Sequence, residues 1–321
     1  MAIARLAISV LLANALWICT SESLLQAGED ETWPQWRGPT WNGVAPHADP
    51  PITWSETENL RWKTPLEGAG WGSPVVWGDR IFLLTAIPLD KKMPIPDVIP
   101  AGIEKMKQHR DAIGSWKAQR FAIVCLNRIT GKLLWSQTVH EAMPHQGHHR
   151  KGGFASASPV TDGQHIYAYF GSFGLHCYDH EGRFVWKKEF ETQPIKYGVG
   201  EGSSPALFGN TLVIPVDTEG QSYVVAIDKR TGEEIWKQDR DEETNWSTPS
   251  IFTHAGRRQV VVNGVAFQGN HPYSASDLSG LIASEIGKPM TLKDIQVLAA
   301  RIEAFYHEAG YPLGKVVVPR Q

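Results

Sequence analysis

The sequence lacks both an excess of basic residues and an apolar run as long as a membrane span. Its formal net charge is −3, so it offers no basic stripe of the kind that a nucleic-acid-binding domain needs, and no nucleic-acid partner is expected. The longest apolar run, residues 6–19, is shorter than the ~20 residues of a spanning helix. Hydrophobic content of 42% and charged content of 20% indicate a folded, core-forming chain.

The short apolar run and the basic residue before it are typical of an export signal. Arg5 precedes the run, and Ala27 is a candidate cleavage point, which predicts a signal peptide over residues 1–27. Two alternatives stay open at this stage: lipidation at Cys19, and an uncleaved signal that anchors the chain in the membrane. We expect a periplasmic protein that associates with the outer membrane, or that an uncleaved signal holds at a membrane.

A unit that begins with Ser-Pro or Thr-Pro and ends with Trp recurs about every 45 to 50 residues. The starts are Ser73-Pro74, Ser158-Pro159, Ser204-Pro205 and Thr248-Pro249, and the closing tryptophans are Trp62, Trp135, Trp186 and Trp236. Within a unit, short alternating segments are separated by turn residues. The second unit predicts strands over 157–160, 165–170, 175–178 and 184–188, and the third predicts strands over 204–207, 211–216, 223–227 and 234–237. Four short strands per repeat are typical of a β-propeller blade.

The turn between the last two strands of each unit is the most specific part of the repeat. Residues 226–236 read A-x-D-x-x-T-G-x-x-x-W, residues 125–135 are close to this pattern, and the second unit is one residue shorter. We expect the side chain of Asp179 or Asp228 to cap the turn and Gly131 or Gly232 to take a positive φ. The tryptophan should lay its apolar face between adjacent blades.

Two of the three cysteines occupy equivalent positions in neighbouring units, Cys125 and Cys177. Equivalent points on packed sheets lie about 10 Å apart. A disulfide needs Cα atoms within about 7 Å, so we predict two buried free thiols.

These residues resemble the quinoprotein-type propeller repeat. The segment Trp33 to Pro39, followed by Asn59 to Trp62, resembles the entry of proteins similar to the propeller subunit of the bacterial outer-membrane assembly machine. The resemblance implies a propeller domain, which we bound at 32–259. It implies no cofactor, because the vicinal Cys-Cys pair of the quinone-dependent dehydrogenases is missing and no catalytic Asp or metal site can be placed.

The number of blades is too small for an ordinary closed propeller, which has about 4 to 8. We count three full blades, with Trp62 as the last strand of an incomplete blade and residues 248–262 as the start of another. The two fragments either combine or leave the ring open.

Two insertions interrupt the pattern. Residues 87–119 are longer than an ordinary loop, and 103–109 within them have a short helical pattern. His140, His145, His148 and His149 precede the second blade, where they form either a solvated loop or a metal site.

From residue 260 the sequence pattern changes. We predict a strand over 260–267, a helix from Ser274 to about Glu285, a second helix from Thr291 to Ala309, and a strand over 315–319. This order, with Gly269-Asn270, Gly287-Lys288-Pro289, Gly310-Tyr311 and Pro319-Arg320-Gln321, resembles the POTRA domain of two-partner secretion (ShlB-type) transporters. The expected fold is therefore mainly β: an incomplete propeller, then a small α+β POTRA-like unit (β-α-α-β) over 260–321.

Both resemblances imply a non-enzymatic periplasmic scaffold linked to outer-membrane protein assembly or secretion. The implied partner is an outer-membrane barrel or a secreted polypeptide, and strand addition at an open sheet edge is the implied mode. In the tail the expected partner-binding residues are Tyr273, Tyr311, Val316, Val317 and Val318. The alternatives are a carbohydrate- or peptide-binding propeller without a secretion role, and a quinone- or metal-dependent oxidoreductase.

Overall fold

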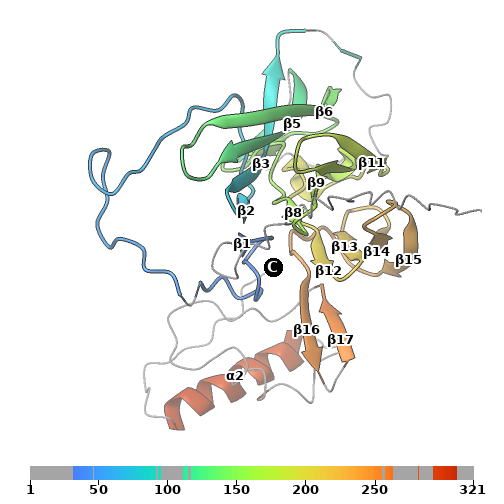
Figure 1. The fold of residues 1–321 in the computed structure, drawn as a ribbon. Coiled ribbons are helices and arrows are strands. Elements are labelled where there is room, and N and C mark those ends of the chain that lie inside the picture. Colours follow the sequence, from blue (N-terminus) through green and yellow to red (C-terminus); the bar gives the residue numbers. More distant parts are fainter. Residues whose placement is uncertain are drawn as a thin grey trace, which may run out of the picture.

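The computed structural model describes residues 32–45, 47–91, 93–94, 111–114, 117–254, 257–262, 281 and 292–308. Within these ranges the chain is mainly β, with antiparallel sheets that fan out through an open arc (Figure 1). The predicted fold class, an incomplete propeller followed by a small POTRA-like unit, is confirmed.

Three sheets form the body of the arc. The first has the order β1-β2-β3-β5-β6, with β1 Thr32–Trp33, β2 Val75–Trp77, β3 Arg80–Leu89, β5 Ala118–Asn127 and β6 Leu133–Ala142. The second has the order β11-β10-β9-β8, with β8 Val160–Thr161, β9 His165–Tyr169, β10 Leu175–Asp179 and β11 Phe184–Lys188. The third has the order β12-β13-β14-β15, with β12 Ala206–Phe208, β13 Thr211–Val216, β14 Ser222–Asp228 and β15 Glu234–Arg240.

Two smaller sheets complete the β structure. β16 Ser250–His254 pairs with β17 Arg257–Val261, and β4 Ala112–Ile113 pairs with β7 His148–His149. Two short 3-10 helices lie in connections, η3 Gly171–Phe173 and η4 Lys196–Gly198.

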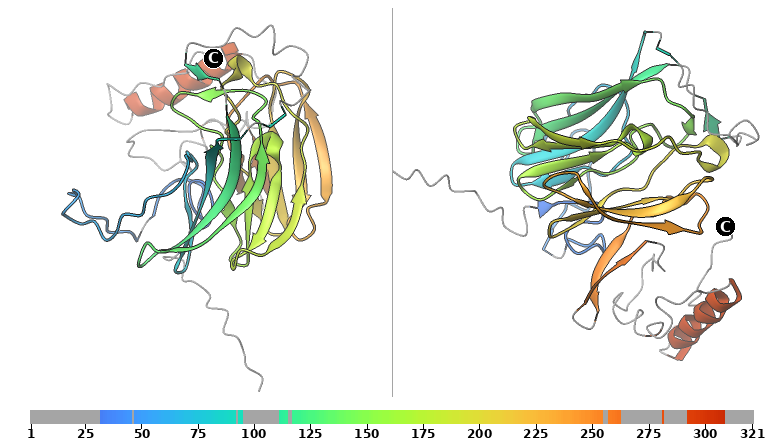
Figure 2. Two further views of the ribbon diagram at one scale, coloured as in Figure 1. Left: turned by 90° about the horizontal axis from the view of Figure 1, so that it is seen from above. Right: turned by 90° about the vertical axis from the view of Figure 1, so that its right-hand side faces the viewer.

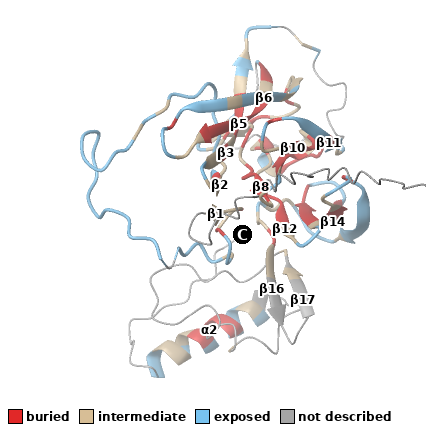
Figure 3. Ribbon diagram, viewed as in Figure 1, coloured by how far each residue is buried: buried red, intermediate tan, exposed pale blue. Residues whose placement is uncertain are grey.

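The sheets stack side by side, so the two middle strands of a blade are covered on both faces (Figure 2). This explains why β13 and β14 are apolar nearly throughout and almost wholly buried, whereas the outer strand β15 is exposed (Figure 3). Two clusters fill the spaces between sheets, one around Phe82 and Phe121 and one around Tyr167 and Ile214.

Three of the four repeated tryptophans, Trp62, Trp135 and Trp186, tie their segment to the turn of the next blade. The indole Nε1 of Trp62 donates to the carbonyl of Arg128 at 2.9 Å, that of Trp135 to His180 at 2.9 Å, and that of Trp186 to Lys229 at 3.0 Å. Each indole also lies on the turn glycine, which leaves no room for a side chain. A Cβ added at Gly131, Gly182 or Gly232 would approach the ring to 2.5, 2.9 or 2.6 Å. We call this arrangement the tryptophan clamp.

The turns that receive the clamps are built alike. The side-chain Oδ1 of Asn127, Asp179 and Asp228 accepts the N–H of the residue two positions later. Gly131, Gly182 and Gly232 have φ of +69°, +82° and +77°. Each aspartate is also paired with an arginine in its own turn, Arg183 or Arg230.

A second set of contacts links the inner strands. The backbone N–H of Ser73 donates to Ser158 Oγ at 2.8 Å, that of Ser158 to Ser204 Oγ at 2.9 Å, and that of Ser204 to Thr248 Oγ1 at 3.0 Å. The Ser-Pro and Thr-Pro starts of the repeat therefore form a ladder of hydrogen bonds from blade to blade along the inside of the arc. Proline follows at each step, where its missing N–H leaves no donor unpaired.

Cys125 and Cys177 are buried and free, as predicted, and each faces the clamp tryptophan of the adjacent strand in register. Burial raises the pKa of Cys125 to about 12 and also raises that of Cys177. Both thiols therefore stay protonated at neutral pH and act as small core groups.

Three details differ from the sequence predictions. Trp62 lies in an extended segment outside any strand, because no neighbouring strand is present for it to pair with, although its side chain still forms a clamp. The insertion is shorter than 87–119, since β3 and β5 remain paired as far as Leu89 and Ala118. The β16–β17 ladder pairs Ser250 with Val261, so β17 crosses the predicted domain boundary at 259/260, which stays a prediction.

In the tail, α2 spans Leu292–Glu308 and buries Leu298, Ala299 and Ile302, in line with the predicted apolar stripe. Several predictions lie outside the described residues. These are the leader 1–27, the short helical pattern 103–109, the first tail helix 274–285, the strand 315–319, and Tyr273, Tyr311, Val316, Val317 and Val318.

Replacing Gly232 by alanine should destabilise the fold more than the same change at Gly198. Both residues have positive φ, so alanine costs about 1–2 kcal/mol at either site. At Gly232 the new Cβ also meets the Trp186 ring, which adds about 1–3 kcal/mol of overpacking. At Gly198 nothing lies within 4 Å of the added Cβ. The denaturant midpoint by circular dichroism measures both, and equal losses would contradict the clamp.

Candidate functional site

One end of the stacked sheets carries most of the irregular chain. In an antiparallel four-strand meander, the connection between the second and third strands and the exit from the fourth strand lie at the same end. Here that end holds residues 143–159, 170–174, 189–205, 217–221 and 241–249. We call it the loop face. The insertion between β3 and β5 also emerges there, and its strand β4 pairs with β7 of the 143–159 segment.

A pocket with a mixed, mainly apolar lining opens on the loop face between the first three loop segments. Its cavity volume is about 30 Å³, and it is partly open to solvent. The lining alternates backbone-exposing glycines with aromatic and polar side chains. Those used below are His145, Gln146, Tyr169, Phe173 and Glu201.

Glu201 is held against the backbone of the second blade. Its two carboxylate oxygens accept the N–H of Ser172 at 3.0 and 2.9 Å, and Oε1 also accepts the Ser172 hydroxyl at 3.1 Å. Ser172 Oγ in turn accepts the N–H of Gln193 at 3.1 Å. Gly171 has φ +60°, and an added Cβ would lie 2.3 Å from Glu201 Oε2, so only glycine leaves room for the carboxylate.

Two polar atoms in the pocket lining are buried without a hydrogen-bond partner. They are Nε2 of His145 and Nε2 of Gln146. Gln146 is fixed from its other end, since its Oε1 accepts the N–H of Ile195 at 3.2 Å. The amide of Gln146 therefore presents two N–H donors with no acceptor. Unpaired buried polar atoms are rare in folded proteins and call for a reason, such as a ligand.

The electrostatics of the pocket follow from desolvation. Burial raises the pKa of Glu201 to about 7, although its bonds from Ser172 oppose the shift. Burial lowers the pKa of His145 to about 4, so the imidazole is neutral at physiological pH, and its bond to the Gln193 backbone only partly offsets this. Burial also raises the pKa of Tyr169, which keeps its hydroxyl protonated.

These groups form a set of hydrogen-bond donors and acceptors suited to a polar, uncharged ligand. The Ser172 hydroxyl donates to Glu201 and accepts from Gln193, so both its proton and a lone pair are engaged in holding the carboxylate. The arrangement therefore indicates binding through Gln146, His145 and Glu201 rather than activation of the serine.

Exposed aromatic side chains surround the pocket. Trp71 lies against Gly153, and Trp246 lies against Gly202 and donates its indole N–H to the carbonyl of Gly200 at 2.8 Å. Tyr197 is exposed and has φ +62°, an uncommon conformation for a residue with a side chain. Such strain gathers at binding sites, where the surrounding structure maintains it.

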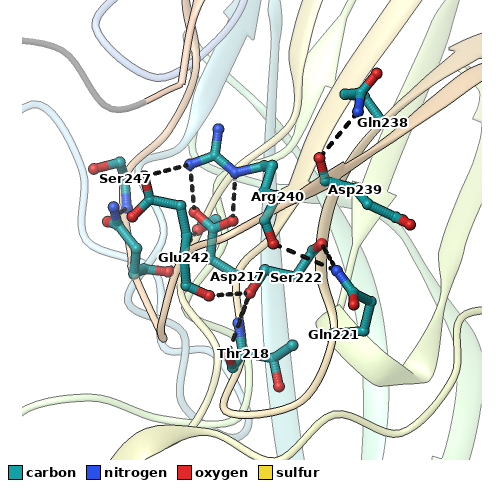
Figure 4. Close-up of polar contacts among 11 residues, drawn as sticks. Asp217, Thr218, Gln221, Ser222, Gln238, Asp239, Arg240, Glu242 and Ser247 are labelled. Carbon is teal, nitrogen blue, oxygen red and sulfur yellow. Dashed lines mark hydrogen bonds and ion pairs between the residues drawn. The ribbon is translucent and has the colours of Figure 1, made fainter. Parts of the chain in front are cut away.

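A buried ion pair fixes the loops beside the pocket. Arg240 donates to Asp217 at 2.9 and 3.3 Å, and Ser222 joins Thr218 to the carbonyl of Glu242 (Figure 4). Burial raises the pKa of Asp217 despite the arginine. The network ties the 217–221 loop to the segment that leaves β15, so this part of the loop face is preorganised.

The four histidines of the predicted cluster do not converge. His140 and His145 both pack near Phe173, with ring centroids 5.9 and 5.6 Å from it, whereas His148 and His149 form β7. In the part of the chain that the structure describes, no group of three or more metal-ligating side chains comes together.

Sequence reasoning did not identify Gln146 or Glu201. The only local signal was the run Gly198-Val199-Gly200-Glu201-Gly202 just before a Ser-Pro start, in which a single acidic residue stands among glycines. Gln146 has no such local signal, because its position depends on a hydrogen bond from Ile195, 49 residues further along the chain.

A family model described as "Outer membrane protein assembly factor BamB" matches residues 119–280, just over half of the chain. The chain belongs to this family. A second model, "POTRA domain, ShlB-type", matches residues 260–321, so the two matches overlap over 260–280. Both predicted resemblances are thereby confirmed.

Solved structures of propeller proteins are also similar to the chain. BamB from Moraxella catarrhalis is 13% identical, with 53% of this chain and 58% of that one covered and a TM-score of 0.28. Quinohemoprotein alcohol dehydrogenase from Comamonas testosteroni is 13% identical, with 67% and 28% covered and a TM-score of 0.35. A europium-containing methanol dehydrogenase is 14% identical, with 56% and 26% covered and a TM-score of 0.34.

The chain spans about a quarter of the length of these dehydrogenases, and likenesses this distant carry no conclusion about activity. The comparison with curated proteins found no match. Among the helices that the structure describes, none is both long enough and apolar enough to cross a membrane.

The raised pKa of Glu201 predicts a pH-dependent loss of stability. Its folded-state pKa of about 7 exceeds that of an ordinary, unfolded-state glutamate, so the folded chain binds more protons between about pH 4.5 and 7. The contribution of Glu201 to the free energy of unfolding therefore falls as pH rises through that window, by up to about 3 kcal/mol.

Glu201→Gln should flatten this slope in unfolding curves measured from pH 4 to 8. The exposed Glu191, replaced by Gln, is the matched control and should keep the wild-type slope. An unchanged slope in the Glu201 variant would show that the carboxyl is not desolvated.

Proposed function

We propose that the chain is a non-enzymatic periplasmic scaffold that binds polypeptides during outer-membrane protein assembly or secretion. The observation that carries the proposal is the pair of family matches: one chain joins a BamB-family propeller to a ShlB-type POTRA segment. The first is described by its role in outer-membrane protein assembly, and POTRA units bind polypeptides by strand addition. A shared location in the periplasm follows, reached through the predicted leader 1–27.

The pocket chemistry supports a polypeptide ligand. A peptide group has one N–H donor and one carbonyl acceptor. The unpaired N–H groups of Gln146 suit the carbonyl, while Glu201 and the His145 nitrogen suit the N–H. The exposed rings of Trp71, Trp246 and Tyr197 offer apolar contact area to side chains on either side of that group.

In the tail, Tyr273, Tyr311 and the strand Val316 to Val318 remain our proposed partner-binding residues. They belong to the POTRA match, and the expected contact is with an outer-membrane barrel or a secreted chain.

A carbohydrate ligand is the second candidate, because exposed tryptophans such as Trp71 and Trp246 also stack on sugar rings. It differs from the first in needing no peptide group at Gln146, so the same experiment separates the two.

Binding of an unfolded outer-membrane barrel protein, held soluble in dilute urea and followed by fluorescence anisotropy, tests the proposal. Gln146→Glu should weaken binding at least tenfold. The variant keeps the oxygen that accepts the Ile195 N–H but replaces the unpaired donor with an acceptor.

Gln164→Glu adds the same charge on an exposed turn at the opposite end of the blades and should leave the affinity unchanged. Equal affinity for an unfolded cytoplasmic protein, or binding displaced by soluble polysaccharide and insensitive to Gln146→Glu, would reject the polypeptide scaffold.

A further inference from the structure

One of the four repeat tryptophans, Trp236, forms no clamp with any turn that the structure describes. Trp236 stands at the clamp position of β15, as Trp186 does in β11. Trp186 is 8% exposed and bonded to Lys229, whereas Trp236 is 43% exposed and its indole has no hydrogen-bond partner among the residues that the structure describes. Ile235 beside it is 53% exposed. Of the next blade, the described residues include only the first two strands, β16 and β17, and no described clamp turn covers Trp236.

The other end of the arc carries a turn that shares part of the clamp-turn geometry but has no glycine and no tryptophan on it. We call residues 51–66 the N-terminal arm. In it, Ser55 Oγ accepts the N–H of Thr57, two residues later, as Asn127, Asp179 and Asp228 do in the clamp turns. The N–H of Ser55 bonds to the carbonyl of Glu58 at 3.0 Å, and Asn59 has φ +57°.

The arm also carries Trp62, seven residues after Ser55, just as Trp186 follows Asp179 by seven. The arm therefore has the order of the outer half of a blade, a turn followed by a clamp tryptophan, although its turn closes from Ser55 to Glu58, one residue shorter than the Asp179 turn and two residues shorter than the Asn127 and Asp228 turns. β16 and β17 are the inner half of a blade. Among the described residues, the chain thus has one repeat tryptophan, Trp236, without a turn to pack on, and one turn, Ser55–Asn59, without a tryptophan on it.

The turn of the arm is exposed to solvent, so another molecule can contact it. Residues 51–60 are exposed throughout, with Ile52 at 102% and Trp54 at 82%. Only Trp62 and Thr64 of the arm are fastened to the first blade, through Arg128 and Gly131. The arm of the same chain leaves Trp236 uncovered, because the arc stays open between the two ends (Figure 1).

We propose that a second copy of this chain supplies the half-blade that the described residues lack: Trp236 of one copy packs on the Ser55–Asn59 turn of the other, where Asn59 stands in place of the clamp glycine. Each junction then pairs the β16–β17 half of one copy with the arm of its partner. Two copies close into a ring of six complete sheets and two shared blades. The resulting total of eight blades is the upper end of the usual range of about 4 to 8. Head-to-tail contacts of this kind close into rings when the rotation fits.

The mass of the purified full chain, measured by light scattering after size exclusion, tests the closure. The wild type should be a dimer, and Trp236→Ala should weaken dimerisation at least tenfold. Phe184→Ala removes another exposed aromatic side chain, 56% exposed, from the outer strand of the middle blade and should not change the mass. Circular dichroism checks that both variants remain folded.

A crosslink identifies the contact. In the regular junction Lys188 Nζ lies 3.9 Å from Glu234 Oε2, and the equivalent positions across the proposed junction are Gln238 and Leu60. Gln238→Cys and Leu60→Cys chains, each also carrying Cys19→Ser, are mixed and treated with a short bis-maleimide. They should yield a crosslinked dimer, since the other native thiols, Cys125 and Cys177, are buried. A monomeric wild type, or a crosslink formed only within a doubly substituted chain, would overturn the proposal.

Discussion

The tryptophan clamp is the contact on which the rest of the architecture depends. It combines an indole hydrogen bond to a turn carbonyl with a ring packed on a glycine that has no space for a Cβ. Because the donor and the receiving turn always belong to successive blades, no blade completes its own packing. The inner Ser-Pro ladder follows the same rule at the centre of the arc. Stability is therefore shared between neighbours, as in other repeat proteins, and the last blade in the series is the least supported.

The repeat motif carried most of the fold information that the sequence contained. The predicted strands 184–188 and 211–216 match β11 and β13, because turn residues fix both ends of each strand and β-branched or aromatic residues fill them. Trp62 was wrongly placed in a strand, since strand formation requires a partner and only its side-chain contact depends on the local motif. The ladder between β16 and β17 runs across the predicted 259/260 boundary, which stays a prediction, and such pairing between strands is not a local property of the sequence.

The pocket could not be predicted in the same way. Gln146, Ser172 and Glu201 come from three loop segments, and neither the unpaired amide nor the seated carboxylate has a sequence pattern. What the repeat does establish is where such a site can form, because the meander sends these connections to one end. The Asp217–Arg240 pair then holds that end in shape, so the pocket is supported by rigid sheets rather than by its own loops.

The direction of the clamps also bears on how the chain acquires its structure as it is made. Each donor tryptophan precedes its acceptor carbonyl, by 66, 45 and 43 residues for the three clamps in order. During synthesis from the N-terminus, an indole therefore has nothing to dock onto until the following repeat has emerged. Folding is vectorial as a result: every newly completed sheet finishes the one before it. The growing end always displays one large aromatic group, which is a site where a chaperone could hold the unfinished chain.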